Sequence, residues 1–510
     1  MSIKEVKIKI DDKEVTVPSN WTVIKACHEN GVDVPHYCYH PDLSIAGNCR
    51  ICMVGIKGAP RPVVACAQPI TENMEVTTKG KDIEEARKSV MEFLLINHPL
   101  DCPECDQSGE CRLQNYSYTY GRDHGRFHEE KVVKSKATMG PHVKYWGSRC
   151  IVCTRCVRFT DEVSGTGELG VIYRGDKSEI ALFPGQTLDN PLSMNTVDIC
   201  PVGALVSSDF LFQTRVWNLH SRPSMCSDCA VGCNTRVDMD AKNKIKRIVP
   251  RRNDQVNKEW MCDYGRLSFP YVQENRLMKP MVDGQDAPYK EARKAAANLL
   301  RKPNAVVLVS AWNSNETLAA IKEFVERNLP GAGIAGYANI GRTDEVFPGF
   351  TISGDKNPNR KGMQEVLGID ADASLTELAA DKNPIGTLLL VHNIPGYAVT
   401  PELKAVLDRT ENVILMDLAK SDLLKYGNVA VALPTLTTFE KSGTFVNKDG
   451  IHQKFLPVME PVNFGRNEVE MFHDLAKDIA AAVAAGSGAT GVGATGVAGT
   501  NEHGNTKVKA

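Results

Sequence analysis

The residues of this sequence that could do chemistry are cysteines, and they lie closest together in HPLDCPECDQSGEC at residues 98–111. This segment holds one histidine and three cysteines among prolines, a glycine and acidic residues that disfavour a long helix or a buried strand. The chain has 16 cysteines, and none of them follows Cys262. Closely spaced C-x-x-C pairs, in a chain expected to stay in the cytosol, indicate metal ligands rather than disulfides.

The cysteines separate into four sets if each metal site takes four ligands. In chain order, these sets are Cys38, Cys49, Cys52 and Cys66; His98, Cys102, Cys105 and Cys111; Cys150, Cys153, Cys156 and Cys200; and Cys226, Cys229, Cys233 and Cys262. All of the cysteines but Cys27 are used in this way, and His98 supplies the one ligand still missing. Cys27 shares a short predicted helix with Val23 and Ile24, so we expect it to be a core residue.

The spacing within the sets favours iron–sulfur clusters. In the first set, the region around Gly47 lets backbone amides point at sulfur, as in a 2Fe–2S ferredoxin, although the first gap is wider than the plant-type spacing. The C-x-x-C-x-x-C run of the third set, completed by a remote Cys-Pro, is typical of a 4Fe–4S cluster. Structural zinc also takes Cys₄ and Cys₃His ligands and stays open as the alternative. For His98, the alternative is a surface or capping histidine.

Composition and charge narrow the class of protein. The chain has 510 residues, which is enough for several domains, and 42% hydrophobic and 24% charged residues are ordinary for a globular protein. A net charge of −2 gives no basic field for nucleic acid or an anionic membrane. The N-terminus lacks the apolar core of a signal peptide, and no apolar run approaches the roughly 20 residues that span a bilayer. We therefore expect a soluble cytosolic chain.

The predicted elements divide the chain into a cysteine-rich half and an α/β half. IKEVKIKI and KEVTV predict a β-hairpin, followed by a helix over residues 22–30 that Ser19 caps and Gly31 closes. A second helix over residues 82–97 leads to His98. The later elements alternate between strands and helices, which predicts a parallel, doubly wound sheet. The strands are residues 305–312, 387–393, 412–418 and 429–434, and the helices are residues 316–329 and 401–410.

These motifs resemble the large iron–sulfur subunit of NADH:quinone oxidoreductase, respiratory complex I. The resemblance covers residues 1–280 most specifically, through PHYCYHPDLSIAGNCRICMV, HPLDCPECDQSGECRLQ, CIVCTRCVRF, DICPVGALVSSDF and CSDCAVGCNTRV. It implies one 2Fe–2S cluster on the first set and 4Fe–4S clusters on the other three, with His98 as an imidazole ligand. The chain would then accept electrons from a flavin subunit and pass them toward quinone-side subunits, without a catalytic residue of its own. The fourth cluster occurs in only part of the family.

The resemblance also implies a multidomain α+β and α/β fold. The expected domains are a 2Fe–2S ferredoxin-like (β-grasp) domain over 1–78, a His/Cys₃ 4Fe–4S domain over 79–125, a ferredoxin-like 4Fe–4S domain over 126–220, a 4Fe–4S domain of molybdopterin-oxidoreductase type over 221–280, a molybdopterin-oxidoreductase-like α/β domain over 281–480, and a disordered Gly/Ala-rich tail over 481–510. ALPTLTTFEKSGTFVNKDGIHQ at 432–453 carries the likeness to the molybdopterin fold. His452 replaces a frequent arginine there, and no cysteine remains to hold molybdenum, so we expect no molybdopterin.

Two glycine patterns imitate a dinucleotide site. GAGIAG at 331–336 follows a predicted helix, whereas the fingerprint must follow a strand and open a helix, and GVGATG lies in the low-complexity tail. We therefore expect no NAD or FMN on this chain, which leaves NADH oxidation to a flavin-bearing partner. The resemblance implies a place in the peripheral arm on the cytoplasmic side of a bacterial inner membrane, with the membrane contacted only through the complex. The alternatives are the same module in a soluble NAD-linked hydrogenase or formate dehydrogenase, or a zinc-stapled scaffold.

Overall fold

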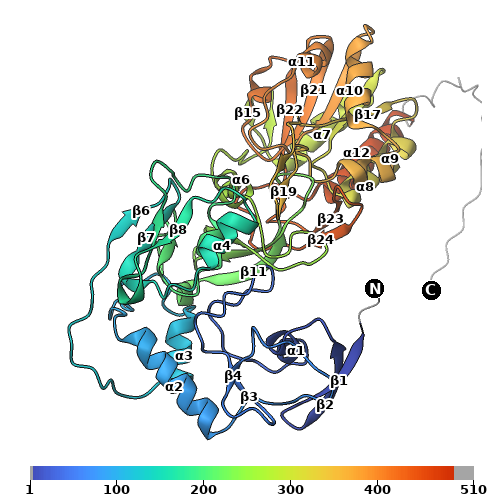
Figure 1. Ribbon diagram of the computed structural model, residues 1–510. Coiled ribbons are helices and arrows are strands. Elements are labelled where there is room, and N and C mark those ends of the chain that lie inside the picture. The colour runs from blue at the N-terminus through green and yellow to red at the C-terminus, as the bar shows by residue number, and fades with distance from the viewer. Residues whose placement is uncertain (1–3, 340, 488–510) are drawn as a thin grey trace, which may run out of the picture.

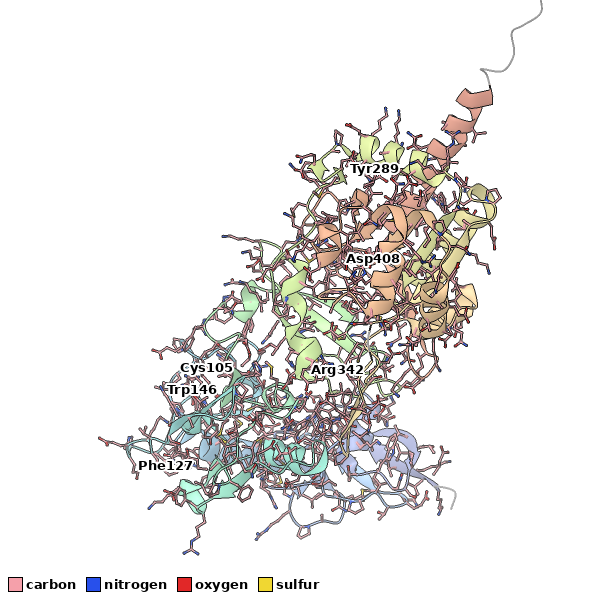
Figure 2. All side chains as sticks on the ribbon, turned by 90° about the horizontal axis from the view of Figure 1, so that it is seen from above. Cys105, Phe127, Trp146, Tyr289, Arg342 and Asp408 are labelled. Carbon is pink, nitrogen blue, oxygen red and sulfur yellow. The ribbon has the colours of Figure 1, made fainter. Side chains whose placement is uncertain are left out.

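The cysteine-rich segments and the C-terminal α/β region occupy opposite ends of the molecule (Figure 1). The computed structural model describes residues 4–339 and 341–487. In Figure 2, the labelled Cys105 and Trp146 lie in the cysteine-rich part, and Asp408 and Tyr289 lie in the α/β part. The fourth set of cysteines lies between the two ends, since it shares a hydrophobic core with Phe439, Val458 and Met459 of the C-terminal half.

The N-terminal segment forms a five-stranded sheet in the order β2-β1-β5-β3-β4. Its elements are β1 Glu5–Ile10, β2 Lys13–Pro18, α1 Val23–Glu29, β3 Met53–Ile56, β4 Val63–Val64 and β5 Glu75–Thr77. The strands β1 and β2 pair antiparallel as the predicted hairpin, around Asp11 and Asp12 at φ of 43° and 71°. Val6, Ile8 and Ile10 alternate inward, as one buried face of a strand requires.

Helix α1 closes this small core, and Cys27 is fully buried within it, as predicted. The prediction that Ser19 caps α1 is wrong. The helix begins after Thr22, while the Ser19 N–H donates to the Lys4 carbonyl and so belongs to the end of the hairpin. Gly31, at φ +78°, follows the helix and closes it as predicted, because only glycine takes this left-handed conformation without strain.

Two helices and two small sheets follow. Helices α2 Lys81–Leu95 and α3 Arg112–Tyr120 flank the second cysteine segment. A sheet in the order β10-β7-β6 comes next, with a β8–β9 hairpin beside it. The bounds are β6 Lys136–Thr138, β7 Val143–Trp146, η1 Gly147–Arg149, α4 Arg155–Glu162, β8 Leu169–Ile172, η2 Gly175–Lys177, β9 Glu179–Leu182, α5 Asn195–Asp198 and β10 Leu205–Ser207. Long loops join these short elements, and the loops carry the cysteines.

A second three-stranded sheet, in the order β11-β12-β13, supports the fourth set of cysteines. Its region comprises η3 Val216–Asn218, β11 His220–Met225, β12 Asn234–Met239, β13 Ile245–Pro250, α6 Asp263–Leu267 and η4 Phe269–Val272. The cysteines at 226–233 occupy the connection between β11 and β12, and Cys262 directly precedes α6.

The C-terminal region is built on a seven-stranded sheet in the order β15-β14-β22-β21-β20-β16-β17. The strands from β22 to β17 run parallel, and β14 joins the edge antiparallel. The bounds are β14 Met281–Val282, β15 Gln285–Asp286, α7 Tyr289–Leu300, β16 Ala305–Ser310, α8 Asn315–Asn328, β17 Gly333–Tyr337, β18 Glu345–Val346, β19 Thr351–Ile352, α9 Arg360–Leu367, α10 Ala371–Ala380, β20 Ile385–Val391, α11 Pro401–Asp408, β21 Thr410–Asp417, η5 Asp422–Lys425, β22 Val429–Pro434, β23 Gly443–Val446, β24 His452–Phe455 and α12 Glu468–Ser487.

Both faces of this sheet are buried, which explains its continuous apolar strands. Val307 and Val309 pack on one face in a core that includes side chains of α7, α8 and α12. Leu308, on the same strand, faces the other way into a core shared with α10 and α11. Helices therefore cover both faces, and the predicted doubly wound sheet is confirmed.

Three further expectations concern the GAGIAG motif, the C-terminal tail and membrane-spanning helices. GAGIAG follows α8, and its residues 333–336 already belong to β17, so the motif follows a helix and ends in a strand, as predicted for a false dinucleotide motif. Helix α12 continues to Ser487, so residues 481–487, which we assigned to the disordered tail, are helical. The rest of that tail, 488–510, lies outside the described residues. Within 4–339 and 341–487, no helix is both long and apolar enough to cross a membrane.

Candidate metal centres

The first set lies on the loop between α1 and β3 and just after β4, and its side chains converge. The Cys38 N–H donates to the Cys49 sulfur at 3.5 Å. The Cys49 and Cys66 thiols hydrogen-bond to Cys38, which lowers the pKa of Cys38. Cys66 makes the same kind of contact with Cys52. The four predicted ligands therefore point into one site.

The backbone of this loop wraps around the sulfurs, as the sequence predicted. Gly47 has φ +62° and Arg50 has φ +61°, left-handed conformations that turn the chain sharply inward. The amides of Asn48 and Cys49 consequently point at Cys38, where they favour the thiolate. Amide–sulfur hydrogen bonds of this kind are among the features that set the potential of an iron–sulfur cluster.

The second set opens toward the surface. His98, Cys102 and Cys111 line one cavity of about 450 Å³, which also borders Phe127. Burial, helped by the nearby Lys131 cation, lowers the pKa of His98 to about 4. Its imidazole is therefore neutral at physiological pH, which is the form that binds metals. Cys102 is exposed, whereas Cys105 and Cys111 are buried.

Cys105 lies on the inner side of the second set, against the loop that carries Cys200. A Cβ atom added to Gly203 would lie 2.2 Å from the Cys105 sulfur. The Arg112 N–H donates to the Pro201 carbonyl at 3.2 Å, which ties the second segment to the same loop. Glycine is required at 203 because any larger residue would occupy the space of the sulfur.

The four cysteines of the third set converge. Cys150, Cys153, Cys156 and Cys200 line one small cavity together with Tyr145. Burial raises the pKa of Cys150, Cys153 and Cys200 to about 11 each. Four converging thiols in such surroundings ionise only when a cationic group lies among them.

The loop between Cys150 and Cys156 has an unusual backbone. Val152 and Thr154 have φ of 49° and 61°. β-Branched residues rarely take this left-handed conformation, and such strain is characteristic of binding sites. The Val152 N–H donates to the Cys150 sulfur at 3.3 Å as a result. The strained turn thus aims an amide at a candidate ligand.

The fourth set is enclosed between β12 and α6. Its four cysteines are all buried, and burial raises the pKa of Cys262 to about 12. Cys262 caps α6, because its sulfur accepts from the Gly265 N–H at 3.5 Å. A Cβ atom on Gly265 would lie 2.6 Å from the Cys226 sulfur. Glycine at 265 thus has the same function at the fourth set as Gly203 has at the second.

The distances between sulfurs help to distinguish zinc from a cluster. A single tetrahedral zinc, with Zn–S bonds of about 2.3 Å, holds its thiolates roughly 3.8 Å apart. Among the described residues, no three ligand atoms of any of the four sets lie within 4.8 Å of one another. The spacing therefore fits a polynuclear group better than one metal ion.

The third set contacts the other three. On the first-set side, Arg158 donates to the carbonyls of Cys38, at 2.6 Å, and Cys153, at 3.4 Å. On the second-set side, the loop after Cys200 contacts Cys105 through Gly203 and Arg112 through the Pro201 carbonyl. Toward the fourth set, the Trp260 ring lies 5.1 Å from Phe159 on α4. The first and second sets are thus joined through the third.

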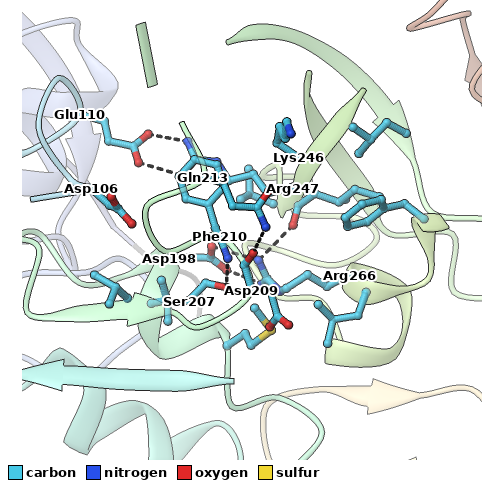
Figure 3. Close-up of a pocket in the computed structure, with 18 of the residues that line it drawn as sticks. Asp106, Glu110, Asp198, Ser207, Asp209, Phe210, Gln213, Lys246, Arg247 and Arg266 are labelled. Carbon is cyan, nitrogen blue, oxygen red and sulfur yellow. Dashed lines mark hydrogen bonds and ion pairs between the residues drawn. The ribbon is translucent and has the colours of Figure 1, made fainter. Parts of the chain in front are cut away.

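Nearby acidic residues are largely neutralised by arginines, which the sequence did not reveal. Asp101 pairs with Arg149 at 2.9 Å. Glu110 accepts two bonds from Arg247, at 2.9 and 2.8 Å. Figure 3 shows Glu110 bonded to Arg247 beside a cavity of about 350 Å³, which residues of the second, third and fourth segments line. These ion pairs offset the negative charge that Asp101 and Glu110 bring to the surroundings of the second site.

At the carboxyl edge of the C-terminal sheet, polar side chains bond to one another. Asn393, after β20, donates to Asn313 at 2.8 Å and to Glu468 at 2.7 Å. Lys441 pairs with the same Glu468 oxygen at 2.6 Å. This edge is where ligands bind in doubly wound folds. Some of the buried groups here satisfy each other, whereas Glu468 Oε2 and His392 Nε2 are buried without a hydrogen-bond partner among the described residues.

Each of the four sets lies within a region of the chain that matches a known protein family. The matching descriptions are 2Fe-2S iron-sulfur cluster binding domain over 3–81, NADH-ubiquinone oxidoreductase-G iron-sulfur binding region over 87–126, NADH-quinone oxidoreductase subunit 3, ferredoxin-like domain over 140–206, NADH-ubiquinone oxidoreductase NDSU1/NuoG-like, 4Fe-4S domain over 226–270, and Molybdopterin oxidoreductase over 336–478. These matches confirm the predicted fold class, and the chain has both 2Fe–2S and 4Fe–4S binding domains.

Three characterised relatives confirm the resemblance seen in the motifs. The NADH-ubiquinone oxidoreductase 75 kDa subunit of Reclinomonas americana is 41% identical over 63% of this chain and 46% of its own length. NADH dehydrogenase [ubiquinone] iron-sulfur protein 1 of Solanum tuberosum is 41% identical over 63% of this chain and 45% of its own length. The NADH-ubiquinone oxidoreductase 78 kDa subunit of Neurospora crassa is 46% identical over 54% and 38%. The match spans less than half the length of each relative.

Proposed function

We propose that this chain is the iron–sulfur electron-relay subunit of an NADH:quinone oxidoreductase, which passes electrons from a flavin subunit toward quinone. The observation that carries the proposal is the arrangement of the sets, since the third lies in contact with both the first and the second. A relay needs such neighbours, whereas independent zinc staples do not. The named relatives and family regions support the same function.

The ligands follow from this proposal. The first set holds one 2Fe–2S cluster, and the second, third and fourth sets each hold a 4Fe–4S cluster, with His98 as the only imidazole ligand. When bound, the clusters supply one-electron carriers. The chain's own residues hold them, aim amides at the sulfurs and exclude water. The neutral imidazole of His98 and the buried thiols are the donor types such clusters take.

The proposed partners are a flavin-bearing subunit that oxidises NADH and the quinone-side subunits of the peripheral arm, on the cytoplasmic side of a bacterial inner membrane. The chain itself carries no NAD, FMN or molybdopterin in this proposal. The absence of molybdopterin is supported by the sequence, in which no cysteine follows Cys262 to hold molybdenum. The domain limits expected from the sequence are also part of the proposal, except that helix α12 extends the last α/β domain to Ser487.

The test is the iron and acid-labile sulfide content of protein purified without oxygen, with electron paramagnetic resonance (EPR) of the reduced sample. About fourteen irons per chain, with both 2Fe–2S and 4Fe–4S signals, are expected. About ten would show that one cubane site is empty. Stoichiometric zinc without sulfide would overturn the relay and support a zinc-stapled scaffold.

A further inference from the structure

Arg155, the first residue of α4, is a buried cation without an ordinary counter-ion. Its side chain is 4% exposed. Among the described residues, no carboxylate lies within salt-bridge distance of it. Arg149 and Arg266, which are buried to the same degree in the cysteine-rich part, each have an aspartate partner. Burying an unpaired charge is costly, so a negative group must face Arg155 in the working protein.

The contacts of Arg155 show where that negative charge lies. Its guanidinium donates to the carbonyl of Tyr39, next to Cys38, and to the carbonyl of Ile199, next to Cys200, at 3.1 Å. Its Nε is buried and has no hydrogen-bond partner. The guanidinium thus lies between the segment of the first set and the segment of the third set.

We propose that Arg155 is the shared counter-ion of the first and third clusters, and that its fixed positive charge raises the reduction potential of both. The proposal rests on the cluster assignment above. Each cluster gains one electron on reduction and becomes one charge more negative, so a nearby cation stabilises the reduced form more than the oxidised form. A single positive charge between the two clusters raises both reduction potentials, so the difference between the two potentials stays small. Arg155 therefore acts on the clusters through its charge.

The experiment compares Arg155→Met, which removes the charge, with Arg155→Lys, which keeps it but cannot reproduce the forked donation to two carbonyls. Midpoints are measured by EPR redox titration of the intact chain. Arg155→Met should lower the 2Fe–2S midpoint and one 4Fe–4S midpoint by about 59 mV each. This shift is roughly a tenfold change in the one-electron equilibrium constant. The remaining clusters should move less and serve as an internal reference. Arg155→Lys should retain most of both potentials.

The outcomes separate charge from structure. If Met and Lys variants change the two midpoints alike, the carbonyl bonds matter rather than the charge, and the proposal is overturned. Unchanged midpoints in Arg155→Met overturn it as well. If Arg155→Met cannot assemble the two clusters while Arg155→Lys can, the need for charge is supported; loss in both variants counts against it. Wild-type protein without iron and sulfide would instead refute the proposed function itself.

Discussion

Gly203 stands so close to Cys105 that a Cβ atom on residue 203 would lie 2.2 Å from the Cys105 sulfur. Cys105 belongs to the second set of candidate ligands, whereas Gly203 lies on the loop that carries Cys200 of the third set, 98 positions further along the chain. The contact brings the loop of the third site against the second site. The lack of a side chain at residue 203 therefore determines how closely the second and third sites, two candidate electron carriers, can approach each other.

Replacing Gly203 with alanine should disturb the second cluster. The added methyl group must displace the Cys105 sulfur, since real Cβ atoms do not come so close to another atom. We expect the iron content to fall by about four per chain, or the second cluster's EPR signal to broaden. Gly427→Ala is the matched control, because its Cβ would meet nothing within 4 Å. Full iron content and an unchanged spectrum in Gly203→Ala would refute the close contact.

Replacing His98 with cysteine should retain a cluster but lower its potential. A thiolate in place of the neutral imidazole adds one negative charge to the site and disfavours the reduced form. We expect a downward shift of at least about 59 mV, a tenfold change in the one-electron equilibrium, in an EPR redox titration. His124→Cys tests specificity, since His124 borders the same cavity yet is exposed and pairs with Asp123. Equal midpoints in wild type and His98→Cys would count against ligation by His98.

The ion pair between Arg276 and Glu440 should be the most costly to break in the C-terminal half. Both side chains are fully buried, and the closest atoms are 2.8 Å apart. Glu440→Gln leaves the Arg276 charge uncompensated, so unfolding should become easier by about 3 to 5 kcal/mol. In contrast, Asp408→Asn breaks an exposed pair with Lys404 and should change the free energy of unfolding far less. Thermal unfolding followed by circular dichroism measures both. Similar shifts in the two variants would contradict the difference in burial.

The stability of the C-terminal region should fall as pH rises from about 4 to about 7, through Asp417. Burial raises the pKa of Asp417 from its ordinary 3.8 to about 7 in the folded state. Between these values the folded protein holds a proton that the unfolded chain has released, so increasing pH favours unfolding. The loss approaches about 4 kcal/mol, at roughly 1.4 kcal/mol per pKa unit. Above about pH 7, this contribution becomes constant.

Asp417→Asn supplies the comparison, because an amide of the same shape does not titrate. Denaturant unfolding from pH 4 to pH 8 should show a flatter pH dependence in the variant than in the wild type. Ser421 donates to Asp417 at 2.7 Å and can donate equally to the amide oxygen, so the fold should persist. Parallel pH profiles would show that Asp417 is ionised in both states.

Local patterns predicted much of the architecture. The alternation of β1 and β2 and the apolar runs of β16, β20, β21 and β22 predicted strands within one or two residues of the observed bounds. These predictions succeeded because buried strands need a face or a core that the residue types already describe. The proposed capping by Ser19 failed, because the same residue type also suits the end of a hairpin, and only the Lys4 contact decides between them.

The sequence by itself determined which residues can bind metal, since thiol and imidazole groups at C-x-x-C spacing have few other uses, and it indicated the family through those motifs. Tertiary structure alone decided which sites are neighbours. Gly203 carries no chemical signal in DICPVGAL, and Arg155 looks like any helix arginine in CIVCTRC. Their importance comes from contacts with Cys105 and with the Tyr39 carbonyl, which lie far away in the chain. Close approach and burial of charge are properties of the folded core, because they depend on what surrounds a residue in space.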